Sequence, residues 1–191
     1  MLDEICIYKW VIHFLSVLLV YYIPFFSSMQ AFWADIWDIF YMIDNLKNNI
    51  INMAENLSAL MYENNMSSSE LAAKIHVTVQ TVNRWKRGEQ LMMLSKAIEV
   101  SNVLHCTLDC LIGRNDSVLN FIPKKCPPFY ERLREVMRAN GVTRYRLTKE
   151  TNIKESHLYA WKNGADVKLP TVLKLANYFD VTVDYLVGRD R

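Results

Sequence analysis

Six polar side chains lie close together on one short stretch of this 191-residue chain. They are Gln80, Thr81, Asn83, Arg84, Lys86 and Arg87. Amides and hydroxyls can form hydrogen bonds with base edges, and cations attract phosphates. Gln80 or Asn83 can contact adenine through two hydrogen bonds, and Val79 can touch a thymine methyl. These residue types, at this spacing, predict contact with double-stranded DNA.

Two short helices joined by a tight turn are expected to hold these side chains. Ser67 and Ser68 are N-cap candidates for the first helix, and Thr78 is the candidate for the second. Gly88 suits the position that follows the second helix. The apolar positions at helical spacing are Leu71, Ala72 and Ile75 in the first helix, and Val79, Val82 and Trp85 in the second.

This stretch resembles the helix-turn-helix of the Cro/lambda-repressor-type family, also called the XRE family. The matching signature is a polar cap, Glu70-Leu71-Ala72, a turn, Thr78 to Val82, and Trp85 to Gly88. A second match runs from Thr143 to Gly164. The resemblance implies a repressor-like, sequence-specific transcriptional regulator that contacts the major groove with the third helix of each copy.

The two matches belong to an internal repeat. A shift of 76 residues aligns Leu71 with Leu147 and Trp85 with Trp161, and after a one-residue gap the shift becomes 75. The shift of 75 aligns Asp109 with Asp184, and Gly113-Arg114 with Gly188-Arg189. Because both tryptophans recur among apolar neighbours, we expect them to pack in a core and not to stack on bases. Asn65 aligned with Gly141, and His76 with Asn152, predict left-handed turns.

Each repeat is expected to form five helices. They fall near 53–64, 68–75, 79–87, 94–103 and 107–112, and near 129–139, 144–151, 155–162, 170–178 and 182–187. We therefore predict an all-α protein with two tandem five-helix lambda-repressor-like domains, preceded by an apolar helical segment. The predicted divisions are 1–52, 53–116, a proline-containing linker over 117–128, and 129–191.

The DNA-binding residues predicted in the first repeat are Ser68, Thr78, Val79, Gln80, Thr81, Asn83, Arg84, Lys86 and Arg87. Those in the second are Arg144, Lys154, Glu155, Ser156, His157, Tyr159 and Lys162. The second set departs from the first, because Glu155 repels phosphates although it can accept from a cytosine amine. The second repeat is expected to recognise a different sequence or to bind the backbone with little specificity.

Charge and motifs narrow the class of protein. Residues 119–191 carry 14 Lys/Arg against 8 Asp/Glu, so the basic excess lies in the last third. The chain contains no Gly-rich phosphate loop, no G-x-S-x-G and no H-E-x-x-H, and we expect neither an enzyme nor a cofactor. Cys106 and Cys110 align with the apolar Val181 and Tyr185, which predicts buried free thiols instead of a metal site.

The first third of the chain contains a long apolar run. Residues 10–26 are almost wholly apolar and lie at the short limit for a membrane span. Three interpretations stay open: an anchor, a buried helix, or sequence upstream of a later start. The flank after the run carries Asp35, Asp38 and Asp44, whereas a cytoplasmic flank should be basic.

Two further functions stay open beside DNA binding. A protein-interaction module is one, because small helical bundles bind protein partners and Glu155 permits it. A membrane-tethered regulator is the other, through residues 10–26. We expect DNA as the main partner, with self-association or a protein partner as alternatives, and a cytoplasmic location with or without a tether.

Overall fold

The computed structural model of the chain describes residues 36, 52–114 and 125–190. Within these residues the regular structure is helical, apart from one isolated β-bridge. None of the helices described there is long and apolar enough to cross a membrane. The expected membrane-length run at 10–26 and nearly all of the segment 1–52 lie outside the described residues.

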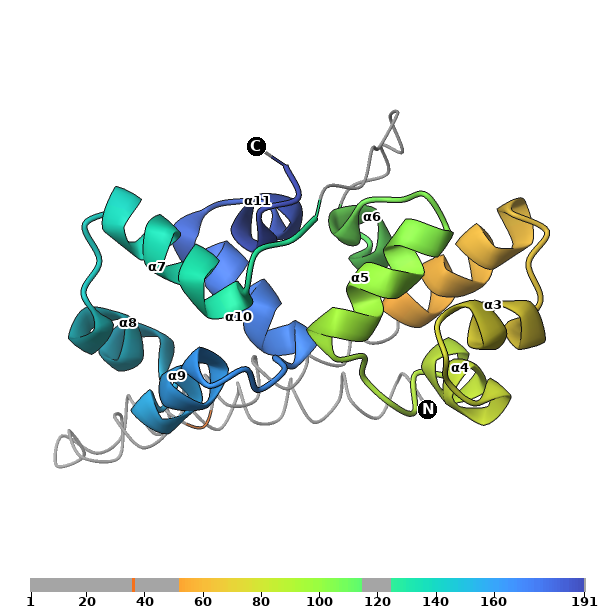
Figure 1. Cartoon of the computed structure of the whole chain (residues 1–191), viewed down its shortest axis with the longest axis horizontal. Helices are drawn as coiled ribbons and strands as arrows, with labels where there is room; N and C mark the ends of the chain where they lie inside the picture. The colour runs from red at the N-terminus through yellow and green to blue at the C-terminus, as the bar shows by residue number, and fades with distance from the viewer. Residues whose placement is uncertain (1–35, 37–51, 115–124, 191) are drawn as a thin grey trace, which may run out of the picture. The chain divides into compact units, whose positions relative to one another are not determined.

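Both repeats lie within one compact unit, Leu46–Arg191. The first repeat contains a helix over 52–63, α3 (Ser68–Lys74), α4 (Val79–Lys86), α5 (Leu94–Val103) and α6 (Leu108–Ile112). The second contains α7 (Phe129–Ala139), α8 (Arg144–Thr151), α9 (Glu155–Lys162), α10 (Leu169–Phe179) and α11 (Val183–Val187), as labelled in Figure 1. The prediction of an all-α chain with tandem five-helix repeats is confirmed. Apart from the start of the first helix, which borders residues outside the described part, each helix end falls within one residue of its expected position.

Side-chain caps begin the helices where the sequence predicts them. Ser67 caps α3, with its hydroxyl accepting from the Glu70 N–H at 3.2 Å, while the Glu70 carboxylate accepts from the Ser67 N–H at 2.8 Å. The Ser67 N–H and the Ser67 hydroxyl both donate to the Glu70 carboxylate and lower its pKa, because they favour the charged form. Thr78 and Thr143 cap α4 and α8 in the same way, by accepting from an N–H three residues later.

The predicted left-handed turns are present. Asn65 and His76 have φ of 49° and 53°, and the aligned Gly141 and Asn152 have 63° and 53°. In both pairs of aligned positions the backbone therefore has the same left-handed conformation, although only one of the four residues is glycine.

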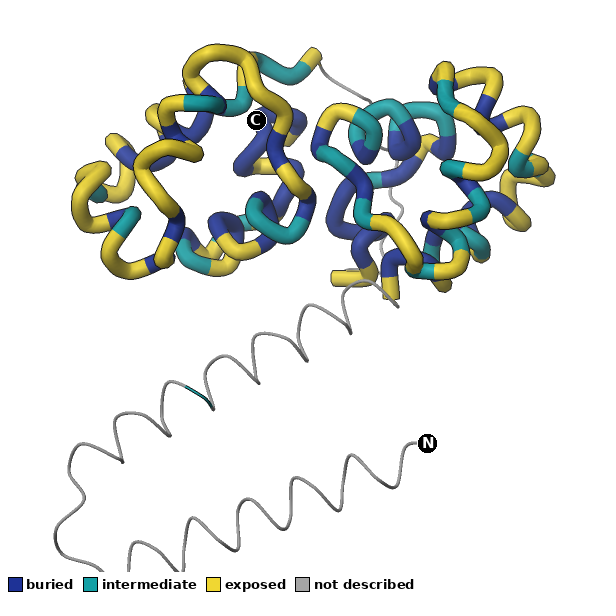
Figure 2. The backbone as a smooth tube through the Cα atoms, turned by 90° about the horizontal axis from the view of Figure 1, so that it is seen from below, coloured by how far each residue is buried: buried dark blue, intermediate teal, exposed yellow. Residues whose placement is uncertain are grey.

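One continuous apolar core includes buried residues of both repeats, and Figure 2 shows buried positions recurring along the helices. Leu71 and Leu147 are fully buried, and the side chains of Trp85 and Trp161 are 3% and 9% exposed. The tryptophans therefore pack in the core, as predicted.

Val79 does not join the core, and its predicted place in the apolar stripe is wrong. It is 40% exposed because it is the first residue of α4, one turn before the buried Val82. Cys106 and Cys110 are buried as predicted. Burial raises the pKa of the Cys106 thiol to about 12, so it stays protonated.

The two repeats contact each other through equivalent residues. The Leu94 N–H donates to the Val167 carbonyl at 2.8 Å, and the Leu169 N–H donates to the Met92 carbonyl at 3.3 Å. Between these bonds Met93 forms the antiparallel bridge with Lys168, its own counterpart under the 75-residue shift.

A second exchange joins α6 and α11 at their first turns. The N–H groups of Leu108 and Asp109 donate to Asp184 Oδ2 at 2.7 and 3.2 Å. In return the Asp184 N–H donates to Asp109 Oδ2 at 3.2 Å. Each carboxylate also pairs with an arginine of its own repeat, Asp109 with Arg114 at 3.2 Å and Asp184 with Arg189 at 3.1 Å.

The described end of the expected linker packs against the second repeat. A Cβ atom added at Gly188 would lie 3.0 Å from Pro127 Cδ, so this glycine admits the chain that enters α7. The division of the chain at 116 and 128 stays a prediction.

The buried tryptophans allow a test of the core. We expect Trp85→Ala and Trp161→Ala each to lower the free energy of unfolding by roughly 3–5 kcal/mol, because a large buried side chain is replaced by a cavity. Chemical denaturation followed by circular dichroism measures this change. Tyr62 is 85% exposed, and Tyr62→Ala is the matched control. Equal effects of the three changes would contradict the core assignment.

The buried carboxylate of Asp184 predicts a pH effect on stability. Burial raises its pKa from 3.8 to about 6, against the opposing charge of Arg189, and the carboxylate of Asp109 adds repulsion. The folded protein therefore holds a proton at this site more firmly than the unfolded chain, and the site contributes more stability as the pH falls toward 5. We expect the free energy of unfolding of the wild type to rise relative to that of Asp184→Asn between about pH 7 and about pH 5. A flat or falling difference would contradict this.

Candidate nucleic-acid interface

The exposed face of α4 carries the residues that the sequence singles out for base and phosphate contacts. Gln80, Asn83, Arg84 and Arg87 together line a shallow recess of about 310 Å³. Their spacing of three, four and seven residues places them on one side of the helix. The structure therefore brings two amides and two guanidinium groups to one surface.

Three members of the predicted set are engaged with other side chains: Thr78, Thr81 and Arg87. The Thr78 and Thr81 hydroxyls lie 2.8 Å apart, and Thr78 also caps the Thr81 N–H at 3.2 Å. Arg87 donates from Nε and Nη2 to the two carboxylate oxygens of Glu89 at 2.6 and 2.9 Å. This pairing raises the pKa of Arg87 and lowers that of Glu89, because each charge favours the other.

Glu89 was not among the predicted site residues. It follows Gly88, whose left-handed φ of 67° turns the chain back beside α4. An acidic residue two positions after Arg87 was the sequence signal for this ion pair. Only the turn at Gly88 shows that the two side chains meet.

The remaining candidates of the first repeat are Val79 and Lys86 on α4 and Ser68 on α3. Val79 is exposed, and Lys86 and Ser68 are half-buried. Ser68 is the first residue of α3, one position after the capping Ser67. The capping pair of Ser67 and Glu70 already occupies two of the N–H groups at this helix start.

The second repeat has an equivalent helix with a different surface. Lys154 precedes α9 without a side-chain cap. Its other predicted residues are all exposed: Glu155, Ser156, His157, Tyr159 and Lys162. The His157 ring lies 6.1 Å from the Trp161 ring, and the Tyr159 side chain is 68% exposed.

Arg144 and Tyr145 begin α8, the helix that precedes α9. The Arg144 guanidinium lies 5.9 Å from the centre of the Tyr130 ring, and Lys149 lies at the same distance from the Tyr145 ring. Tyr145 is 74% exposed and was not predicted as a site residue. Under the 76-residue shift Tyr145 aligns with Ser69. This replacement of a small polar residue by an aromatic one was the only sign in the sequence that Tyr145 belongs to the exposed surface.

In the first repeat the short capped helix α3 packs beside α4, and in the second repeat the capped helix α8 precedes α9, which packs on α7; α4 and α9 each carry polar and charged groups on an exposed face. This arrangement defines the helix-turn-helix class of DNA-binding proteins.

The sequence model of the Cro/C1-type HTH DNA-binding domain matches residues 56–117 and 132–189, more than half of the chain. The chain belongs to this family and carries two tandem copies of its domain, as the sequence predicts. Neither the comparison with curated proteins nor the comparison with solved structures gives a match. Membership supports a DNA-binding regulator, and domains of this family are typically not enzymes.

The pairing of Arg87 with Glu89 yields a test of the α4 surface. We expect Glu89→Gln to tighten DNA binding at low salt and to steepen the salt dependence by about one unit, because the released guanidinium can neutralise one more phosphate. Fluorescence anisotropy across a salt series measures both effects.

The matched control removes a carboxylate elsewhere. Glu131 pairs with Arg134 on the exposed side of α7 at 3.3 Å. Glu131→Gln changes the net charge by the same amount, but it leaves α4 unaltered. Equal changes in salt slope for the two variants would show that net charge, and not Arg87, is responsible.

Proposed function

We propose that this protein is a sequence-specific transcriptional regulator that inserts α4 into the major groove of DNA. The recess lined by Gln80, Asn83, Arg84 and Arg87 carries this proposal. It offers two amides that can form paired hydrogen bonds with adenine, and the guanidinium of Arg84 beside them attracts phosphates, while that of Arg87 is paired with Glu89. We propose a repressor-like role, which the resemblance to Cro/lambda-repressor-type proteins favours, and binding that blocks access to a promoter is its simplest form.

The residues have separate roles in this proposal. Gln80 and Asn83 contact base edges, whereas Arg84 and Lys86 contact phosphates on either side. Thr81 contributes less, because its hydroxyl already lies 2.8 Å from that of Thr78. Val79 is exposed at the start of the helix, where a thymine methyl can meet it.

In the second repeat, α9 is the equivalent recognition helix. Ser156, His157 and Tyr159 face solvent and provide hydrogen-bonding groups, while Lys154, Lys162 and Arg144 supply positive charge. Glu155 selects against a phosphate and favours a cytosine amine. We propose that α9 contacts a half-site different from that of α4.

A second candidate function for this repeat is the binding of a protein partner. The exposed side chains of Tyr145 and Tyr159 favour it, since exposed tyrosines are enriched at protein interfaces. Loss of Tyr159 would then weaken a protein complex and leave the DNA footprint unchanged.

A regulator that contacts DNA works in the compartment that holds DNA, and we propose a cytoplasmic location. A membrane tether through residues 10–26 is compatible with it and is tested separately by membrane fractionation.

Substitutions on α4 separate base contacts from phosphate contacts. We expect Gln80→Ala or Asn83→Ala to cost about 1–3 kcal/mol at one base position and to relax the preference there. Arg84→Ala should weaken binding to every sequence and reduce the salt slope by about one unit. Selection of bound DNA from a random pool, repeated with each variant, measures all three.

Lys174→Ala is a control for the loss of a cation, because Lys174 is exposed on α10 instead of on a recognition helix. If Gln80→Ala and Asn83→Ala both left the selected sequence unchanged, α4 would not be the recognition helix.

A further inference from the structure

The contact between the repeats has the pattern of a twofold-symmetric dimer within one chain. Met93 pairs with its counterpart Lys168, and the flanking hydrogen bonds exchange equivalent residues. Asp109 and Asp184, also counterparts, each accept from the other's backbone. In an interface of this kind residue i contacts residue j and j contacts i, which requires an approximate twofold axis.

Helix packing follows the same rule. α5 packs on its counterpart α10, and α6 packs on its counterpart α11. The axis that relates these helices also relates the two recognition helices, because α4 packs on α3 and α9 packs on α7, each within its own repeat.

Several side chains hold this contact beyond the backbone exchange. Arg189 has no exposed side-chain surface, and its guanidinium donates to Ser101 Oγ at 2.8 Å and to Asn102 Oδ1 at 2.9 Å. Arg114 donates in the opposite direction, to the Val181 carbonyl at 3.4 Å. An arginine of each repeat therefore donates hydrogen bonds to acceptors of the other repeat.

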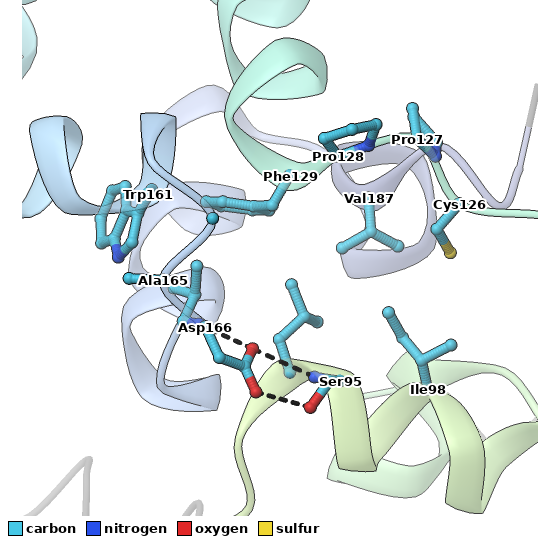
Figure 3. Close-up of a pocket in the computed structure, with 13 residues that line it drawn as sticks. Ser95, Ile98, Cys126, Pro127, Pro128, Phe129, Trp161, Ala165, Asp166 and Val187 are labelled. Carbon is cyan, nitrogen blue, oxygen red and sulfur yellow. Dashed lines mark hydrogen bonds between the residues drawn. The ribbon is translucent and has the colours of Figure 1, made fainter.

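Figure 3 shows a further link at the rim of the contact. The Asp166 carboxylate accepts from the Ser95 N–H at 3.3 Å and from the Ser95 hydroxyl at 2.5 Å. These bonds tie the loop after α9 to the first turn of α5. The start of α5 is therefore held by the backbone bridge and by this side-chain pair.

We propose that this contact fixes α4 and α9 in one twofold-related arrangement, so that a single chain recognises two unlike half-sites, inverted and at one spacing. Asp109, Asp184 and Arg189 are positioning residues for this recognition, since they contact the other repeat and not the DNA. The inference rests on the proposed function. The linker predicted over 117–128 suggests two domains that move independently, whereas this contact holds the two repeats in one fixed geometry.

The test begins with the full chain and a random DNA pool. From the selected site, duplexes are made in which the half-sites are moved apart or one of them is reversed. We expect an insertion of about half a helical turn, ~5 bp, to weaken binding at least roughly tenfold, because the second contact is lost. Reversal of one half-site should have the same effect. Mass measurement of the complex should give one chain per duplex.

Variants connect this discrimination to the positioning residues. We expect Asp184→Ala combined with Arg189→Ala to retain affinity for the first half-site alone and to lose most of the spacing preference, to within about threefold. The control is Glu131→Ala with Arg134→Ala, which removes an exposed ion pair from the same repeat. If the buried double variant unfolds, Ser95→Ala with Asp166→Ala weakens the contact at an exposed position and is scored in the same way.

The results separate this inference from the proposed function. Affinities that change less than about threefold on insertion and reversal would overturn the fixed arrangement, and so would enrichment of one half-site only. Enrichment of no sequence would instead overturn the proposed function. The arrangement is then still tested without DNA, by electron-spin distance measurements between labels on α3 and α8. A narrow distribution supports it, and a broad one overturns it.

Discussion

Two helix N-termini meet where the repeats contact each other, and their backbone N–H groups need acceptors. The first turns of α6 and α11 would otherwise place unsatisfied donors in a buried contact, which costs about 1–3 kcal/mol for each group. Asp184 supplies the acceptor for α6, and Asp109 supplies one for α11. Thr107 and Thr182 each cap one N–H of the helix in their own repeat, and the carboxylate of the other repeat supplies acceptors for further N–H groups. Each carboxylate therefore lies on the helix that the other carboxylate stabilises, and the docked repeats share their helix caps.

The buried charges contribute more to the precise geometry of this contact than to its stability. Asp109 and Asp184 are 6% and 3% exposed, and the Arg189 guanidinium is desolvated with them. Well-packed apolar residues of similar volume often give equal or greater stability than such ion pairs. A carboxylate that must meet two N–H groups, however, has few satisfactory positions, whereas an apolar surface tolerates sliding. We infer that the charges set the angle between the repeats, while Leu94 and Leu169 provide apolar burial.

The sequence alone predicted the architecture, because the repeat made each local signal count twice. The alignment of Asn65 with Gly141 predicted a left-handed turn, which neither residue alone would have indicated clearly. Contacts between side chains distant in sequence were not predictable in the same way. The alignment of Asp109 with Asp184 showed equivalence, but equivalence does not imply contact. The prolines before α7 indicated a linker between separate domains, and only the structure shows Pro127 against Gly188. On α4, helical spacing predicted which residues share a face, but not that Arg87 is held by Glu89.

The fixed contact changes how the covalent linkage contributes to affinity. A flexible linker gives the second domain an effective concentration in the millimolar range, and each binding event still restricts its orientation. When the repeats are already docked, that restriction occurs during folding, so less conformational entropy is lost on binding DNA. The same docking removes tolerance for sites with another spacing, because turning one repeat would break the exchange between Asp109 and Asp184. Outside this contact the two copies are free to differ: Asn83 and Arg84 of α4 correspond to Tyr159 and Ala160 of α9. Two unlike recognition surfaces on one rigid frame favour a DNA site with two different half-sites. A dimer of identical chains would bind such a site equally well in either orientation.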